Sequence, residues 1–234
     1  MTGVDIALPV YNEESILANS VATLRDFLAT HLFCPWQVVV IDNGSTDRTS
    51  AIAEALSQQY PDVSCVHLEQ KGRGRALRKA WLESNADVVS YMDVDLSTKL
   101  DAFVELIHAI DEGYDIAIGS RLMSGSRVRR SLKRELLSRG YNLLIKAMFS
   151  PTFCDAQCGL KTLKCDVAQE LIPFVQDQAW FFDTELLLLA ERKGYRIKEV
   201  PVEWVEDADT RVHVMKTAFE DIKGLLRLRF CPPL

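Results

Sequence analysis

The first half of the chain alternates short apolar runs with segments whose apolar residues recur at helical spacing. Several runs are apolar throughout, as strands buried on both faces of a parallel sheet are. This alternation predicts a repeated β-α unit, and therefore an α/β fold with a mostly parallel central sheet and helices on both faces. The expected strands are 5–8, 38–41, 64–68, 88–92 and 116–118, and the expected helices are 14–30, 46–58, 73–84 and 99–111.

The second half is patterned differently. It predicts a basic amphipathic helix over 130–149, a turn and short strand over 154–164, a strand over 197–204 and a final amphipathic helix over 215–230. Between them lies an expected helix, 183–193, for which Asp183 is either the N-cap or a site residue. The chain has no internal repeat or linker, so we expect one domain, 1–234, with a shared core.

Two carboxylates, Asp93 and Asp95, directly follow the expected strand 88–92. At positions i and i+2 they would share one face at the carboxyl end of that strand, the edge where open α/β sheets bind ligands. Hard oxygen ligands there suit Mg²⁺ or Mn²⁺ carrying a substrate diphosphate. The alternative is that the two aspartates cap a helix beginning near Thr98.

The formal net charge of −6 conceals an asymmetry. Residues 121–139 contain seven cations against Glu135 alone, which makes this segment +6 and the remainder −12. One basic patch on an acidic protein indicates a local anion, such as a phosphate or an anionic membrane surface, and argues against binding nucleic acid along its length. A solvated helix face is the alternative.

Hydropathy bears on location. No apolar run approaches the roughly 18–20 residues that span a bilayer, and no signal peptide is evident, so we expect a cytoplasmic protein. We expect it to bind anionic membranes peripherally through Arg127, Arg129, Arg130 and Lys133, with the final helix assisting. Whether a separate membrane protein acts as a partner is left open.

Two common nucleotide sites are not supported. The glycine fingerprint of dinucleotide-binding folds is absent after the first strand, and no G-x-x-x-x-G-K-[ST] loop occurs. Gly72-Arg73-Gly74 does lie between an expected strand and helix, but a third glycine is missing. We expect Gly72 to permit a tight turn and close backbone approach to a bound ligand.

Three motifs at the ends of the expected strands resemble the family 2 glycosyltransferases of the GT-A fold, whose central sheet is Rossmann-like. The motifs are 9–14 (PVYNEE), 40–47 (VIDNGSTD) and 93–95 (DVD), and the likeness covers nearly the whole chain. Four further motifs resemble polyprenyl-phosphate hexosyltransferases such as dolichyl-phosphate mannose and glucose synthases, the last two being closer to the glucosyl branch. They are 119–121 (GSR), 137–140 (LSRG), 155–159 (DAQCG) and 180–185 (WFFDTE).

The resemblance assigns residues 1–120 to nucleotide-sugar binding. It implies that Pro9, Tyr11, Glu13 and Asp42 hold the base and ribose, and that Arg211 closes the donor site.

Residues 121–234 would bind the acceptor. Arg121, Arg134 and Ser138 match an acceptor-phosphate cluster, while Asp93 and Asp95 match the metal and diphosphate ligands, with Asp95 the more direct. Catalysis would then involve Asp93, Asp95 and Arg121. Mannose synthases often place a glutamine two residues after the second aspartate as a further metal contact, and this chain has Ser97 there, which weakens the mannosyl assignment.

These roles predict an inverting glycosyltransferase that moves a hexose from UDP-glucose or GDP-mannose to a polyprenyl or dolichyl phosphate at the cytoplasmic membrane face. A phosphate acceptor is already mostly ionised at neutral pH, since its second pKa is about 6, and it needs arginines more than a general base. One alternative is a family 2 enzyme with a hydroxyl acceptor on a glycan or small molecule. Another is a nucleotide-sugar-binding regulatory module without activity.

Overall fold

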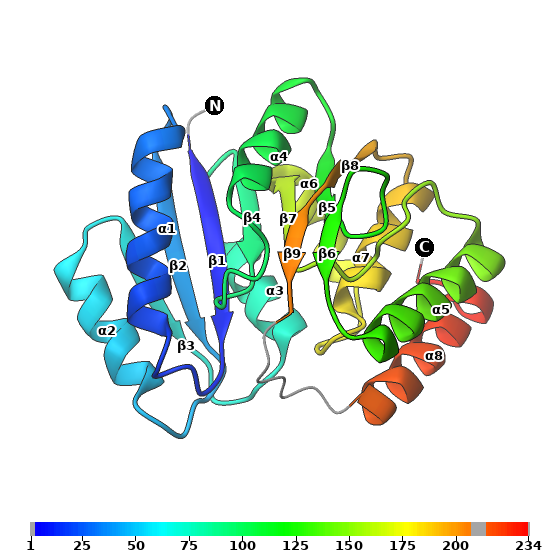
Figure 1. The fold of residues 1–234 in the computed structure, drawn as a ribbon, viewed down its shortest axis with the longest axis horizontal. Helices are drawn as coiled ribbons and strands as arrows, with labels where there is room; N and C mark the ends of the chain where they lie inside the picture. Colours follow the sequence, from blue (N-terminus) through cyan, green and yellow to red (C-terminus); the bar gives the residue numbers. More distant parts are fainter. Residues whose placement is uncertain (1–2, 207–213, 234) are drawn as a thin grey trace.

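A computed structural model of the chain describes residues 3–206 and 214–233. Its centre is a seven-stranded sheet in the order β3-β2-β1-β4-β7-β5-β8 (Figure 1). All neighbours in it are parallel except those of β7, which runs antiparallel to both β4 and β5. The predicted mostly parallel sheet is therefore confirmed. Its strands are β1 (Val4–Val10), β2 (Trp36–Asp42), β3 (Val63–His67), β4 (Val88–Met92), β5 (Ile116–Ser120), β7 (Leu160–Lys164) and β8 (Ile197–Pro201).

Helices cover both faces of the sheet because successive strand residues point to opposite sides. Val38 and Val40 pack into one hydrophobic core, whereas Val39 and Ile41 pack into the other. The first core is closed by α1 (Leu17–His31), α2 (Thr49–Gln59) and α4 (Asp101–Asp111). The second is closed by α3 (Arg73–Glu83), α6 (Cys165–Leu171) with the short 3₁₀ helix Ile172–Phe174, and α7 (Phe182–Arg192).

Three features differ from the sequence expectation. The segment 197–204 is two strands, β8 and β9 (Glu203–Val205), and β9 pairs in parallel with β6 (Arg127–Arg129) as a separate two-stranded sheet. Neither β6 nor α6 was predicted, because β6 consists of two arginines around a valine and α6 spans only seven residues. The antiparallel direction of β7 has no sequence signature, since the side chains of a strand alternate between the two faces of a sheet in the same way in either direction.

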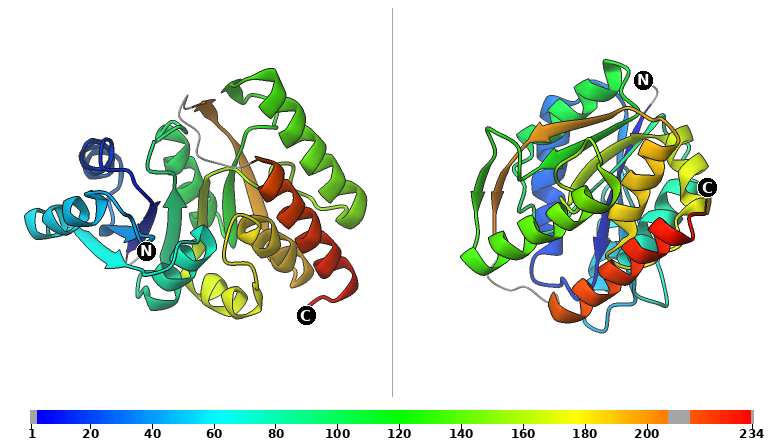
Figure 2. Two further views of the ribbon diagram at one scale, coloured as in Figure 1. Left: turned by 90° about the horizontal axis from the view of Figure 1, so that it is seen from below. Right: turned by 90° about the vertical axis from the view of Figure 1, so that its right-hand side faces the viewer.

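Two amphipathic helices, α5 (Leu132–Phe149) and α8 (Val214–Phe230), lie side by side at one end of the molecule (Figures 1 and 2). They are attached to α7 by polar contacts, with Tyr141 Oη 2.9 Å from Thr184 Oγ1 and Arg227 Nη1 2.8 Å from Glu185 Oε1. Within the described residues, no helix has the length and apolar character needed to cross a bilayer.

Candidate active site

The loops after β1 and β2 are joined by hydrogen bonds at the carboxyl edge of the sheet. The backbone N–H of Asn12 donates to Ser45 Oγ at 2.9 Å, and the N–H of Thr46 donates to Asn12 Oδ1 at 2.8 Å. Asn12 has φ 56°, a left-handed conformation that asparagine tolerates better than most residues. These contacts fix both loops as one wall of the edge.

The predicted base and ribose residues lie together on this wall. Pro9 and Asp42 fall in adjacent rungs of the β1–β2 ladder, and Glu13 donates its backbone N–H to Thr49 Oγ1 at 2.8 Å. Asp42 is fully buried, and its oxygens accept from the N–H of Ser45 at 3.1 Å and contact His67 Nδ1 at 2.7 Å.

Tyr11 follows β1, and the ammonium of Lys71 lies 4.6 Å from the centroid of its ring. The structure thus brings Pro9, Tyr11, Glu13 and Asp42 to one edge, while their contact with a nucleotide stays a prediction.

Asp93 and Asp95 follow β4 in a tight turn. The N–H of Leu96, which has φ 51°, donates to Asp93 O at 3.1 Å, and the N–H of Ser97 donates to Asp95 Oδ1 at 2.9 Å. Asp95 is exposed. Because α4 begins only at Asp101 and has no side-chain cap, the alternative that these aspartates cap the helix is wrong.

Space for the Asp93 carboxylate exists because residue 159 is glycine. A Cβ at Gly159 would lie 1.8 Å from Asp93 Oδ2, while the Gly159 carbonyl accepts the N–H of Asp93 at 3.2 Å. Gly159 is the last residue of the Asp-Ala-Gln-Cys-Gly motif and directly precedes Leu160, the first residue of β7. The start of this antiparallel strand therefore lies against the turn that contains Asp93.

Arg73, at the start of α3, occupies the other side of Asp93. Its Nη2 lies 2.8 Å from Asp93 Oδ1, and its guanidinium lies 4.8 Å from the Tyr91 ring centroid. Burial opposes the charge of Arg73, but Asp93, Tyr91 and Asp183 outweigh it and raise its pKa. Burial likewise raises the pKa of Asp93, although Arg73 opposes that shift.

Behind Arg73 lies a buried network of ionisable side chains that the sequence did not predict. Lys161 on β7 is fully buried, and its ammonium is 2.9 Å from Asp183 Oδ1, 3.1 Å from Tyr91 Oη and 2.7 Å from the Cys158 carbonyl. Tyr91 donates its hydroxyl to the same Asp183 oxygen, and Arg73 Nε is 3.6 Å from Asp183 Oδ2. Asp183 lies inside the first turn of α7 and does not cap it, so the cap alternative is wrong.

The carboxylates present fit a divalent cation that carries a diphosphate. Among the described residues no group of three or more His, Cys, Asp or Glu side chains could hold a metal alone. Mg²⁺ and Mn²⁺ need only one or two protein carboxylates when phosphates and waters complete the shell. The Asp93 side chain is 38% exposed and lies next to exposed Asp95. Burial raises the pKa of Asp93, and a bound cation would lower it again by favouring the ionised carboxylate.

The expected role of Gly72 stays a prediction, and the structure gives this residue a packing role. A Cβ there would lie 2.4 Å from the Gln178 carbonyl, which accepts the N–H of Arg75 at 3.1 Å. The N–H of Gly74 donates to Ala179 O at 3.2 Å. The close backbone approach is thus to the protein's own segment before α7.

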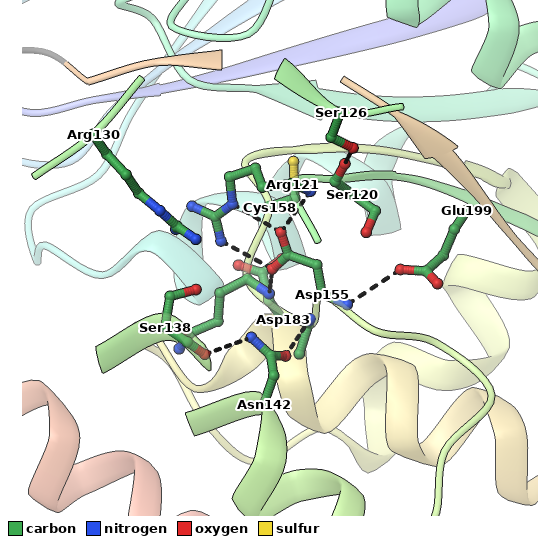
Figure 3. Close-up of polar contacts among 12 residues, drawn as sticks. Ser120, Arg121, Ser126, Arg130, Ser138, Asn142, Asp155, Cys158, Asp183 and Glu199 are labelled. Carbon is green, nitrogen blue, oxygen red and sulfur yellow. Dashed lines mark hydrogen bonds and ion pairs between the residues drawn. The ribbon is translucent and has the colours of Figure 1, made fainter. Parts of the chain in front are cut away.

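In the half of the chain predicted to bind the acceptor, Arg121 is held by a buried carboxylate (Figure 3). Asp155 accepts from the Arg121 backbone N–H at 3.0 Å, from Nε at 2.8 Å and from Nη2 at 2.9 Å. Although burial of Asp155 acts in the opposite direction, Arg121 lowers the pKa of this carboxyl. Asp155 was part of a motif quoted above but had no assigned role, because nothing in a sequence shows which arginine a distant carboxylate binds.

The other two residues predicted to bind the acceptor, Ser138 and Arg134, have different surroundings. Ser138 lies on α5, and its carbonyl accepts the side-chain amide of Asn142 at 3.0 Å. Arg134 forms an ion pair with Glu206, with Nε 3.0 Å from Oε1. Their contact with a phosphate stays a prediction, and Arg211 lies outside the described residues.

Comparisons with known proteins connect this geometry to a family. The family model described as "Glycosyl transferase family 2" matches residues 5–172. Glycosyltransferase AglD of Haloferax volcanii is 35% identical over 228 residues, which cover 95% of this chain and 35% of that protein. Dolichyl-phosphate beta-glucosyltransferase ALG5C of Trichomonas vaginalis is 30% identical over 219 residues, covering 88% of this chain and 65% of that protein.

The chain thus spans about a third of AglD and just under two thirds of ALG5C. Among solved structures, glucosyl-3-phosphoglycerate synthase from Mycobacterium tuberculosis in complex with Mn²⁺, UDP and glucosyl-3-phosphoglycerate superposes with a TM-score of 0.71 at 20% identity. The match covers 97% of this chain and 80% of that chain. The predicted GT-A fold is confirmed.

We expect Gly159→Ala to weaken binding of Mn²⁺ with UDP by at least tenfold, because the added methyl group would displace the Asp93 carboxylate. Calorimetric titration of UDP with and without Mn²⁺ would measure this. Gly140→Ala is the matched control, since a Cβ at Gly140 meets nothing within 4 Å and alanine should stabilise that helix by roughly 0.5–1 kcal/mol. Unchanged metal-dependent binding in Gly159→Ala would show that Asp93 is not held as described.

Proposed function

Because the chain belongs to glycosyl transferase family 2, we propose that it moves a hexose from a nucleotide sugar to a polyprenyl phosphate, with inversion at the anomeric carbon. The observation that carries this proposal is that three carboxylates in the predicted acceptor half are each bound by arginine. Asp155 is bound by Arg121, Glu135 by Arg130 and Arg139, and Glu206 by Arg134. Hydrogen bonds from its arginines lower the pKa of Glu135, as Arg121 lowers that of Asp155.

Carboxylates of lowered pKa are poor general bases at neutral pH, and a hydroxyl acceptor would need a good one. An ionised phosphate needs only to be oriented and screened, which arginines do well. The same cluster therefore favours a phosphate nucleophile over the hydroxyl acceptor considered above.

The residues at the sheet edge would act on the donor. Asp42 and Tyr11 would orient the base and ribose, and Asp93 and Asp95 would hold Mg²⁺ or Mn²⁺, which stabilises the departing diphosphate when bound. Arg73 would add positive charge beside the leaving group, since its guanidinium already lies 2.8 Å from Asp93. The acceptor phosphate would attack the anomeric carbon from the side opposite the leaving diphosphate. This attack would give a β-linked product from an α-linked donor.

We favour glucose as the transferred sugar. Several relatives, including proteins of Saccharomyces cerevisiae and Mus musculus, are named dolichyl-phosphate beta-glucosyltransferase. Ser97 stands where mannose synthases often carry a glutamine, which also weakens the case for GDP-mannose.

Incubation with membrane lipid extract and separately radiolabelled UDP-glucose and GDP-mannose tests the proposal. We expect label from UDP-glucose to enter the organic phase in a product that mild acid hydrolyses, as a glycosyl phosphate should. Label that appears only in water-soluble glycans or small molecules would favour the hydroxyl-acceptor alternative.

We expect Asp95→Ala to lower kcat by at least a hundredfold while leaving the melting temperature within about 2 °C of wild type. The reason is that a metal ligand at the diphosphate contributes several kcal/mol to the transition state, whereas an exposed turn residue contributes little to the fold. Initial rates and thermal melts check both parts. Asp111→Ala, at an exposed position in α4, is the control, and full activity of Asp95→Ala would contradict the metal site.

The proposed lipid acceptor also requires a membrane surface, and the structure revises the predicted one. The Arg130 side chain is only 4% exposed, so it cannot be a surface cation. Instead, α5 and α8 expose large apolar side chains. Leu132 and Leu136 on α5 are 87% and 76% exposed, and Phe219 and Phe230 on α8 are 72% and 75% exposed. Exposed apolar side chains of this kind, on helices that also carry exposed Lys133, Lys146, Lys223 and Arg229, suit insertion between anionic headgroups.

We expect the double change Phe219→Ser and Phe230→Ser to weaken binding to phosphatidylserine-containing vesicles by at least about a hundredfold, since burial of each ring contributes about 1.5–3 kcal/mol. Co-sedimentation at low and high salt would measure this. Phe33→Ser is the control, because Phe33 is fully exposed but precedes β2, far from the two helices in sequence. Binding that salt abolishes and the double change leaves intact would indicate a purely electrostatic surface.

A further inference from the structure

Arg130 differs from the neighbouring arginines in what its guanidinium contacts. It precedes α5, its side chain is only 4% exposed, and its Nε donates to Glu135. Its Nη2 is buried and has no hydrogen-bond partner. A buried donor that stays unpaired costs free energy, and an anionic ligand that accepts from it would remove that cost.

The Arg130 side chain lies near residues of the predicted acceptor cluster (Figure 3). In Figure 3 the Arg130 guanidinium points toward that of Arg121, with Ser138 and Asn142 on α5 beneath them. Asn142 also fixes the floor of this site, because its Oδ1 accepts the N–H of Ala156 at 3.1 Å, next to Asp155. An anion bound between these two guanidinium groups would be attracted by both.

Glu135 does not fully occupy the Arg130 guanidinium. It accepts from Arg130 Nε through one oxygen and from Arg139 Nε through the other, so it is bidentate to neither arginine. Arg139 is 64% exposed, whereas the Arg130 side chain is buried, so an interaction between Arg130 and an anion would be only weakly screened.

We propose that Arg130 is an acceptor-binding residue, and that its Nη2 donates to the phosphate of the lipid acceptor opposite Arg121. Glu135 is then a positioning residue that fixes the Arg130 fork. This inference rests on the proposed function and adds to the predicted cluster of Arg121, Arg134 and Ser138 a residue that the sequence placed on the membrane surface.

The test uses a short-chain polyprenyl monophosphate dispersed in detergent, so that membrane binding plays no part. We expect Arg130→Gln to raise the KM for this acceptor by about 10- to 100-fold, as loss of a charge-assisted hydrogen bond should, and to leave the KM for UDP-glucose within twofold. Arg130→Lys should recover part of the loss, since lysine keeps the charge but lacks the planar fork.

Arg139→Gln is the matched control. Arg139 shares Glu135 with Arg130, but its side chain is 64% exposed, so its loss should leave the acceptor KM within twofold. A second readout is thermal stabilisation by the monophosphate compared with the corresponding alcohol. We expect wild type to be stabilised by the monophosphate alone, and Arg130→Gln by neither.

Three results would overturn the assignment: an unchanged acceptor KM in Arg130→Gln, equal effects of Arg130→Gln and Arg139→Gln, or a rise in the KM for UDP-glucose instead, which would place the group at the donor diphosphate. In each case the wild-type enzyme still transfers sugar to the lipid phosphate, so the proposed function stands. If wild type transfers none, the proposed function fails, and phosphate-dependent stabilisation that Arg130→Gln loses would still support an anion site at Arg130.

Discussion

The ion pair between Lys161 and Asp183 is the interaction on which the rest of the site depends. Lys161 is fully buried, and Asp183 is 3% exposed. Placing two charges there is tolerable only if nearly every hydrogen-bonding position is filled, and Tyr91 and the Cys158 carbonyl fill them. Removing one partner of such a pair typically costs about 3–5 kcal/mol, because the other charge is left buried alone.

This pair joins elements that are distant in sequence. Lys161 belongs to β7, Tyr91 to β4 and Asp183 to α7, and Arg73 extends the network from α3 to Asp93. The antiparallel strand β7 is what makes this possible, since it lies between β4 and β5 and begins at the turn that holds Asp93. The position of the Asp93 carboxylate is thus set by charges behind the sheet edge as well as by the turn that contains it.

Sequence reasoning predicted how the carboxylates after the strands come together better than it predicted the surroundings of the arginines near α5, for a physical reason. Asp42, Asp93 and Asp95 directly follow parallel strands, and the ends of such strands meet at one edge, so their order along the chain is enough to bring them together. Arg130 lies just before α5, and Arg134 lies in its first turn. The orientation of α5 depends on its packing against α7 and α8, and no local sequence pattern encodes that packing. Arg73 and Lys161 escaped notice because arginine and lysine usually lie at the surface.

Affinity for Mn²⁺ together with UDP tests the dependence of the site on the buried pair most directly. Calorimetric titrations of wild type, Lys161→Met, Asp183→Asn and the double variant form a double-mutant cycle. We predict that each single change weakens binding at least tenfold, although neither residue is a proposed metal ligand, and that the double change weakens it by clearly less than the product of the two. Single variants that remain folded and bind Mn²⁺ and UDP as wild type does would contradict the account.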